Sequence, residues 1–105
     1  MISFEDQGWE DYLYWQQSDK AKFKRINQLI RDIQRDPFDG IGKPELLRHN
    51  LTGLWSRRID DEHRLVYAGT SSSRNAVTIT AIDGIPNRAG AEWLANRNAT
   101  LYIQP

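Results

Sequence analysis

One run of the chain, residues 42–67, gathers most of the side chains that could do chemistry. Arginine suits phosphate, because its planar guanidinium matches phosphate oxygens and stays charged. A carboxylate or an imidazole can move a proton when it is positioned on the reacting group. The run therefore has the equipment to hold a phosphodiester and to move protons on it. Its candidate groups are the carboxylate Glu45, the cations Lys43, Arg48, Arg57, Arg58 and Arg64, and the histidines His49 and His63.

The two histidines are poor candidates for a metal site. They have no clustered spacing and the chain has no cysteine, so we expect neither a metal nor another cofactor. His49 lies near Glu45 in sequence and is a candidate proton donor, with a surface or backbone-bonded histidine as the competing interpretation. His63 precedes Arg64 in a predicted strand and should face away from it, so we expect a structural role.

The charged residues also have purely structural interpretations. Glu45 could be a surface carboxylate paired with Arg48 or Lys43. Arg57 and Arg58 are adjacent in a predicted strand, so their side chains point to opposite faces. Only one of them can share a groove with Arg64, and we expect the other to occupy a solvated position of the sheet.

Length and composition limit the class of protein. A chain of 105 residues fits one small domain. Its 14 basic and 14 acidic residues balance, whereas a protein that coats nucleic acid would be strongly basic. If the chain acts on nucleic acid, its cations must be focused in one place, or another body must present the substrate. No apolar run reaches the roughly 18 residues of a membrane span, no secretory signal is expected, and the lack of cysteine suits a reducing compartment.

The elements that must position these groups follow from hydrophobic periodicity. Apolar residues at three- and four-residue steps predict helices, and alternation predicts strands. Asp36-Pro37 ends the second helix, because a residue before proline avoids the helical region. We expect an α+β domain in which two N-terminal helices pack on one face of an antiparallel sheet, with Trp9 and Tyr12 in the core. The predicted elements are strand 2–4, helices 7–17 and 19–35, the hairpin 54–59 and 63–68, and strand 76–82.

The remainder of the chain has a different character. Asp83-Gly84 is a turn signal, and Pro86 ends any strand. We therefore divide the chain into a compact domain, residues 1–82, and an atypical C-terminal extension, residues 83–105.

The central run resembles a known family. Gly-Leu-Trp-Ser-Arg-Arg-Ile at 53–59 and Glu-His-Arg-Leu-Val-Tyr at 62–67 resemble the signature of the Txe/YoeB toxins of bacterial toxin–antitoxin modules, within the RelE/ParE superfamily. The likeness extends back through Trp-Glu-Asp-Tyr-Leu-Tyr-Trp-Gln at 9–16 and through 24–33 and 35–45. It covers about residues 1–82.

The resemblance implies a fold, an activity and partners. It implies the RelE/YoeB-like microbial RNase-type fold and a ribosome-dependent endonuclease that cuts mRNA without a metal. It also implies an antitoxin of the YefM/Phd-like kind, with the ribosome and mRNA as further partners and the bacterial cytoplasm as location. We expect no membrane partner, and the resemblance does not decide whether the chain forms a homodimer.

The same resemblance assigns roles to matching residues. Glu45 would be the general base and Arg64 the cation that stabilises the phosphate. Arg48 and Arg58 would be supporting cations and Glu62 a supporting acid. Lys43 and His49 complete the set that we expect to contact RNA or phosphate.

The C-terminal end departs from the family pattern. Family members end in a short Arg-Tyr-His-Tyr segment whose His is the expected general acid and whose last Tyr contacts substrate. Here Ile85 and Pro86 occupy those positions, and neither side chain can donate a proton. We therefore expect impaired catalysis. One alternative is an inactive homologue that binds antitoxin. The other is a ParE-like topoisomerase poison, which the matches at Glu45 and Arg64 disfavour.

Overall fold

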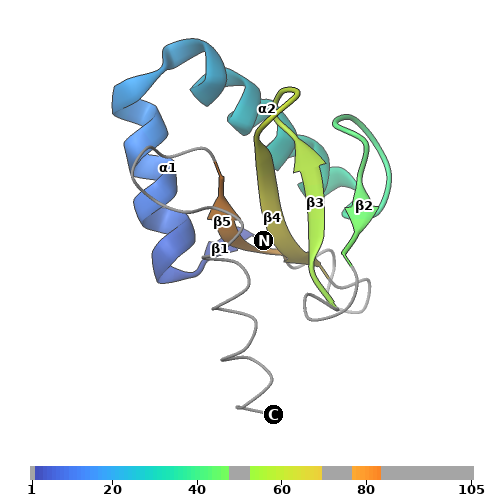
Figure 1. Ribbon diagram of the computed structural model, residues 1–105. Coiled ribbons are helices and arrows are strands. Elements are labelled where there is room, and N and C mark those ends of the chain that lie inside the picture. The colour runs from blue at the N-terminus through green and yellow to red at the C-terminus, as the bar shows by residue number, and fades with distance from the viewer. Residues whose placement is uncertain (1, 48–52, 70–76, 84–105) are drawn as a thin grey trace.

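The computed structural model describes residues 2–47, 53–69 and 77–83. Two helices and a five-stranded sheet make up this part of the chain (Figure 1). The class is α+β, as the sequence predicts. The elements are β1 (Ile2–Phe4), α1 (Asp6–Ser18), α2 (Lys20–Arg35), β2 (Glu45–Leu46), β3 (Trp55–Arg58), β4 (Arg64–Gly69) and β5 (Val77–Ile82).

The two helices follow one another with a single residue between them. Asp19 has an extended backbone, and its side chain accepts a hydrogen bond from the Lys22 backbone N–H at 3.1 Å. This N-cap satisfies one of the free donors at the start of α2. In α2 the apolar residues Ile26, Leu29, Ile30 and Ile33 are buried against the sheet. The predicted amphipathic helix is therefore confirmed, and within the described residues no helix is both long and apolar enough to span a membrane.

The sheet is mixed, which corrects the expectation of an antiparallel sheet. Its strand order is β1-β5-β4-β3-β2, and β1 runs parallel to β5 while the other neighbours are antiparallel. A parallel pair needs a crossover connection, and here both helices and the strands β2, β3 and β4 lie between β1 and β5 in the sequence. β1 and β5 pair through Ile2 with Val77 and through Phe4 with Ile79.

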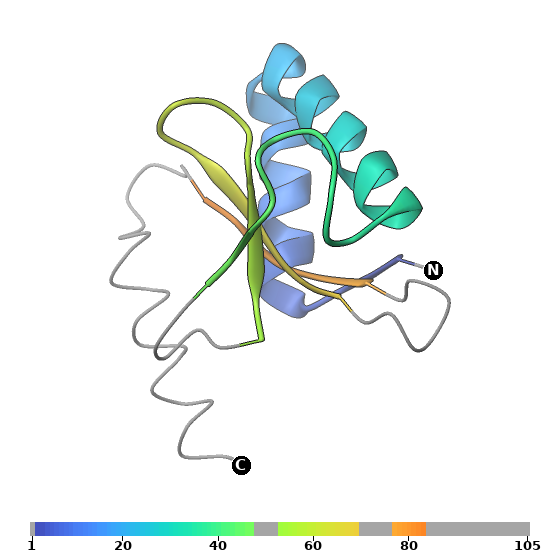
Figure 2. The same ribbon diagram turned by 90° about the vertical axis from the view of Figure 1, so that its right-hand side faces the viewer.

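Both helices lie on one face of the sheet, and the other face carries none of the described helices (Figures 1 and 2). The main core lies between the helices and inward residues of the strands, such as Leu65, Tyr67 and Ile79. A smaller apolar group, built on Leu54, Val66 and Ala81, lies on the helix-free face. Side chains alternate along a strand, so each strand supplies both faces.

Trp9 is not in the core, contrary to expectation. Its side chain is 47% exposed, and its ring stacks on Tyr12 with centroids 5.7 Å apart. The reason is the face that α1 turns to the sheet, which carries Gly8, Asp11 and Trp15 and leaves position 9 at the side.

Gly8 allows α1 to approach the sheet closely. A Cβ at this position would lie 2.3 Å from the Ile79 carbonyl oxygen, a distance that real Cβ atoms do not adopt. One turn further along, Asp11 is fully buried, and its Oδ2 accepts a hydrogen bond from the Ile82 backbone N–H at 2.9 Å. Close approach and this bond together fix α1 against β5.

Gly8→Ala is expected to destabilise the fold, although alanine is ordinarily a better helix former than glycine by about 0.5–1 kcal/mol. Backbone must move to admit the methyl group, and such overpacking typically costs about 1–3 kcal/mol. Urea unfolding measures the change, with Gln17→Ala on the exposed side of α1 as a control expected to stay within about 0.5 kcal/mol. A Gly8→Ala protein as stable as the original would contradict the close approach.

Candidate functional site

The helix-free face of strands β2, β3 and β4 brings candidate residues together. Glu45 pairs with Ser56 across β2 and β3, and Arg58 pairs with Arg64 across β3 and β4. Residues directly opposite in antiparallel strands share a face. The Arg64 Nη1 lies 3.9 Å from the Glu45 Oε2. A mid-chain carboxylate and a hairpin guanidinium therefore meet over the open sheet, together with a second guanidinium.

The charges of this group leave room for an anion. Arg58 and Arg64 are directly opposite in register, and like charges in such pairs destabilise a sheet. The side chains of Glu45 and Arg64 are 62% and 41% exposed, so their ion pair in solvent is worth at most about 1 kcal/mol. A phosphate between the two guanidiniums would relieve their repulsion, since arginine matches phosphate oxygens geometrically.

A hollow of about 280 Å³ lies beside Arg58. Arg25 of α2 and Lys43 contribute cations to its lining, and Asp60 and Asp61 contribute carboxylates. Lys43 has a φ of 51°, which a residue with a Cβ adopts only at a cost. Arg25 had no place in the sequence-based site, because its position on an amphipathic helix gives no sign that it reaches the β3–β4 turn.

The other predicted residues are placed differently. Glu62 is exposed on the turn between β3 and β4, where its backbone N–H donates to Asp60 Oδ1 at 2.8 Å. His63 Nδ1 lies 2.9 Å from Asp60 Oδ2 and 3.3 Å from Lys22 Nζ, in agreement with a structural role. Arg48, His49, Ile85 and Pro86 lie outside the described residues. Among the residues that are described, no cluster of three or more potential ligands could hold a metal ion.

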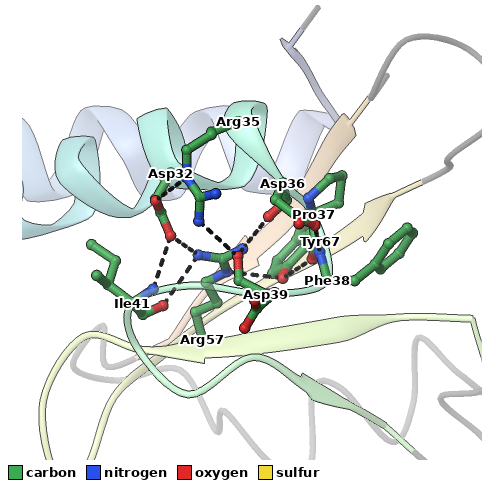
Figure 3. Close-up of polar contacts among 9 residues, drawn as sticks. All are labelled: Asp32, Arg35, Asp36, Pro37, Phe38, Asp39, Ile41, Arg57 and Tyr67. Carbon is green, nitrogen blue, oxygen red and sulfur yellow. Dashed lines mark hydrogen bonds and ion pairs between the residues drawn. The ribbon is translucent and has the colours of Figure 1, made fainter.

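Arg57 corrects a sequence-based expectation. We expected a solvated position of the sheet, but its side chain is fully buried. Alternation points it to the helix face, where the Asp32 carboxylate of α2 lies 2.6 Å from its Nη1 (Figure 3). The phenol oxygen of Tyr67 on β4 accepts from its Nε at 3.0 Å. A signal for this arrangement was present, since alternation places Arg57 on the same side of the strand as Trp55.

Charge and burial set the protonation states of this cluster. The hydrogen bond from Arg35 is the main cause that lowers the pKa of Asp32 to about 2, with further help from the Ile41 N–H and from Arg57 and against the effect of burial. Burial raises the pKa of the Tyr67 phenol, which therefore stays neutral and donates to the Pro37 carbonyl at 2.7 Å. Asp32 is thus a carboxylate, and Tyr67 a neutral donor, across the neutral pH range.

Comparison with known proteins identifies the family. The model of the YoeB-like toxin of bacterial type II toxin–antitoxin systems matches residues 4–82. This chain belongs to that family. The resemblance inferred from the 53–67 signature is therefore confirmed, and the chain is a toxin of the type II toxin–antitoxin class.

Individual relatives agree with this assignment. Toxin YoeB of Escherichia coli K12 is 60% identical over 72 residues, which cover 69% of this chain and 86% of the relative. Toxin YoeB of Streptomyces coelicolor is 62% identical over 69 residues, or 66% of this chain and 82% of the relative. Among solved structures, the YoeB–YefM heterotetramer of Staphylococcus aureus matches with a TM-score of 0.72 and 46% identity over 81% of this chain and 95% of that chain. The YoeB/ParE toxin of Agrobacterium tumefaciens matches with a TM-score of 0.73 and 38% identity over 80% of this chain and 96% of that chain.

Asp32→Asn is expected to remove part of the acid sensitivity of the fold. The folded pKa of Asp32 is about 2 against an ordinary 3.8, so between these values the unfolded chain binds more protons and stability falls as pH drops. Allowing for partial exposure, the effect is about 1–2 kcal/mol, present above pH ~4 and lost toward pH ~2. Urea unfolding at several pH values measures the difference between the original and Asp32→Asn proteins.

Arg35→Gln provides the control for the cause. It removes the hydrogen bond that lowers the pKa of Asp32 most, so the folded pKa should rise toward its ordinary value. The acid loss of stability should then be smaller, and should be complete at a higher pH, than in the original protein. If the original and Asp32→Asn proteins lose stability in parallel from pH 6 to pH 2, the charge on Asp32 does not support the fold.

Proposed function

We propose that this toxin cleaves mRNA on the ribosome without a metal, with Glu45 as the general base and Arg64 as the cation that stabilises the phosphate. One observation carries the proposal: the two groups converge at 3.9 Å on an open sheet face, with Arg58 opposite Arg64. Family membership supports the same activity.

The chemistry follows from what each group can do. The 2′-hydroxyl of RNA attacks the adjacent phosphorus, and Glu45 takes the proton of that hydroxyl. Negative charge develops on the non-bridging oxygens, where the fixed guanidiniums of Arg64 and Arg58 stabilise it. The bond from phosphorus to the 5′-oxygen then breaks, and this leaving oxygen must receive a proton. The products are a 2′,3′-cyclic phosphate and a free 5′-hydroxyl.

Balanced charge explains why the ribosome presents the substrate. Nucleic-acid affinity rises with the number of phosphates that a protein neutralises, and 14 basic residues face 14 acidic ones here. Cations focused at Arg58 and Arg64, with Lys43, Arg48 and His49 as further RNA contacts and Glu62 as a supporting acid, suit a codon that is already held in place. This function places the protein in the bacterial cytoplasm.

The partner we propose is an antitoxin of the YefM kind. The Staphylococcus aureus relatives were solved as a heterotetrameric YoeB–YefM complex and as a YoeB dimer. Those chains align with about four-fifths of this one, at 46% and 47% identity. We therefore infer that this chain binds such an antitoxin, and that a homodimer is compatible with its fold.

The C-terminal segment sets the expected rate. The proton for the leaving oxygen has no donor at Ile85 or Pro86, and a missing general acid typically costs about 100- to 10,000-fold. We therefore propose impaired cleavage, with His49 as a weaker alternative donor. This substitution also favours one second candidate function, that of an inactive homologue that binds antitoxin.

Glu45→Gln and Arg64→Ala are expected to lower cleavage by at least about 100-fold each, because each removes a group that acts on the transition state. A ribosome assay with a defined mRNA and primer extension at the cleavage site measures this. Glu10→Gln and Arg31→Ala make the same charge changes on exposed helix positions and serve as matched controls. Unchanged cleavage in both site variants would rule out the mechanism, whereas no cleavage by the original chain with intact antitoxin binding would favour the binding protein.

Replacing residues 83–105 by Arg-Tyr-His-Tyr is expected to raise cleavage by about 100- to 10,000-fold, because it supplies a proton donor. The same assay measures the gain. Adding Glu45→Gln to the replaced ending should remove most of it, which ties the gain to this site. A replaced ending with no gain would contradict the missing-acid account.

A further inference from the structure

The buried guanidinium of Arg57 holds the segment that leads to Glu45. An arginine has five N–H donors in a fixed plane. Here five acceptors receive them, at distances from 2.5 to 3.3 Å (Figure 3). These are the Tyr67 hydroxyl, the Asp32 carboxylate, and the backbone carbonyls of Asp36, Asp39 and Ile41.

The same acceptors fasten the loop a second time. Asp32 Oδ2 accepts the Ile41 backbone N–H at 2.8 Å while it also pairs with Arg57. The Tyr67 hydroxyl donates to the Pro37 carbonyl while it accepts from Arg57. Residues 36–41 are thus bound at both ends and in the middle by one cluster, which we call the Arg57 cluster: Asp32, Arg57 and Tyr67.

Close packing leaves this loop little freedom. Gly40 has a φ of 138°, and a Cβ there would lie within van der Waals overlap of Asp32 Oδ2. Gly42 has a φ of 78°, and its carbonyl accepts the Arg58 backbone N–H at 2.7 Å. The loop therefore passes directly from the Arg57 cluster on one face of β3 to a backbone bond with the next residue of β3.

The loop delivers Glu45 to the site. Only Lys43 and Pro44 separate Gly42 from Glu45, and proline fixes its own φ. β2 then pairs with β3, and the Leu47 N–H donates to the Leu54 carbonyl at 2.9 Å. Two consecutive residues of β3 thus serve the site from opposite faces. Arg58 lies on the open face, and Arg57 fixes from the inside the segment that carries the carboxylate.

We propose that Arg57 is a positioning residue for cleavage, which sets Glu45 relative to Arg64 by holding residues 36–42 through its five hydrogen bonds. The inference rests on the proposed function for its catalytic consequence, but the ordering of the loop does not. Misplacement of a catalytic group by about 1 Å can cost on the order of 100-fold in rate.

A purely structural role predicts something different. Loss of an ordinary buried contact lowers the global free energy of unfolding. Amide exchange that requires global unfolding then becomes faster by the same factor in the loop and in the rest of the sheet. Positioning predicts a local change, confined to residues 36–47, and a fall in kcat with little change in KM, because Glu45 contributes to the transition state rather than to mRNA binding.

The test uses Tyr67→Phe, which removes one hydroxyl that bridges Arg57 and the Pro37 carbonyl. Tyr12→Phe is the matched control, since the Tyr12 hydroxyl donates to Asn27 Oδ1 at 2.8 Å between the two helices. Arg57→Lys is the stronger variant, because lysine keeps the charge but cannot serve five acceptors in a plane. Amide hydrogen exchange and ribosome cleavage are measured on the full chain.

We expect exchange at the Ile41, Leu47 and Arg58 amides to be about tenfold faster in Tyr67→Phe, with the β1–β5 amides unchanged and with kcat about 10- to 100-fold lower at constant KM. Tyr12→Phe should leave loop exchange and kcat as they are. If Arg57→Lys does not fold, Tyr67→Phe decides alone. Loop exchange in Tyr67→Phe equal to that of the original chain, or raised equally at all amides, would overturn the proposal. If the original chain cleaves nothing, the proposed function fails while the exchange result still decides whether Arg57 orders the loop.

Discussion

The fold depends on the accommodation of one buried positive charge. A guanidinium in a protein interior is costly unless its charge is paired and its donors are satisfied. Arg57 meets both conditions, because Asp32 pairs its charge and four further acceptors take the remaining donors. Three of these acceptors are carbonyls of residues 36–41, so the loop must turn its backbone inward. The hydrogen bonds of Arg57 on the helix face therefore set the path of the loop that leads to β2.

Two consecutive arginines of strand β3 lie in different environments. Arg57 is neutralised inside by Asp32, whereas Arg58 and Arg64 face the helix-free side. There the Glu45 carboxylate lies 3.9 Å from Arg64, and Asp60 and Asp61 line the hollow beside Arg58. Strand register places the two guanidiniums directly opposite each other on that side. In the proposed function a phosphate would meet donors that the sheet has already brought to one face, and such preorganisation is the condition under which electrostatic stabilisation contributes most.

Local pattern predicts some of this architecture and misses the rest for identifiable reasons. The apolar spacing of α2 and the alternation around the 54–68 hairpin are local signals, and both elements form where expected. The pairing of β1 with β5 joins segments that are far apart in the sequence, and the pattern of a three-residue strand does not indicate which strand it pairs with. Alternation predicts that Arg57 and Arg58 point to opposite faces. It cannot show that Asp32, 25 residues earlier in the sequence, forms an ion pair with Arg57. The pairing of Glu45 with Arg64 was inferred from the family signature and not from spacing.

The described end of β5 lies beside the proposed site. Asp11 binds the Ile82 N–H, and the Asp83 N–H donates to the Arg64 carbonyl at 2.9 Å. The described chain therefore leaves the sheet beside Arg64, after the core residues Ile79, Ala81 and Ile82 have been placed. The proposed loss of a proton donor at Ile85 and Pro86 concerns residues beyond this point, whereas the helices, the sheet and the Arg57 cluster are held by contacts among the described residues.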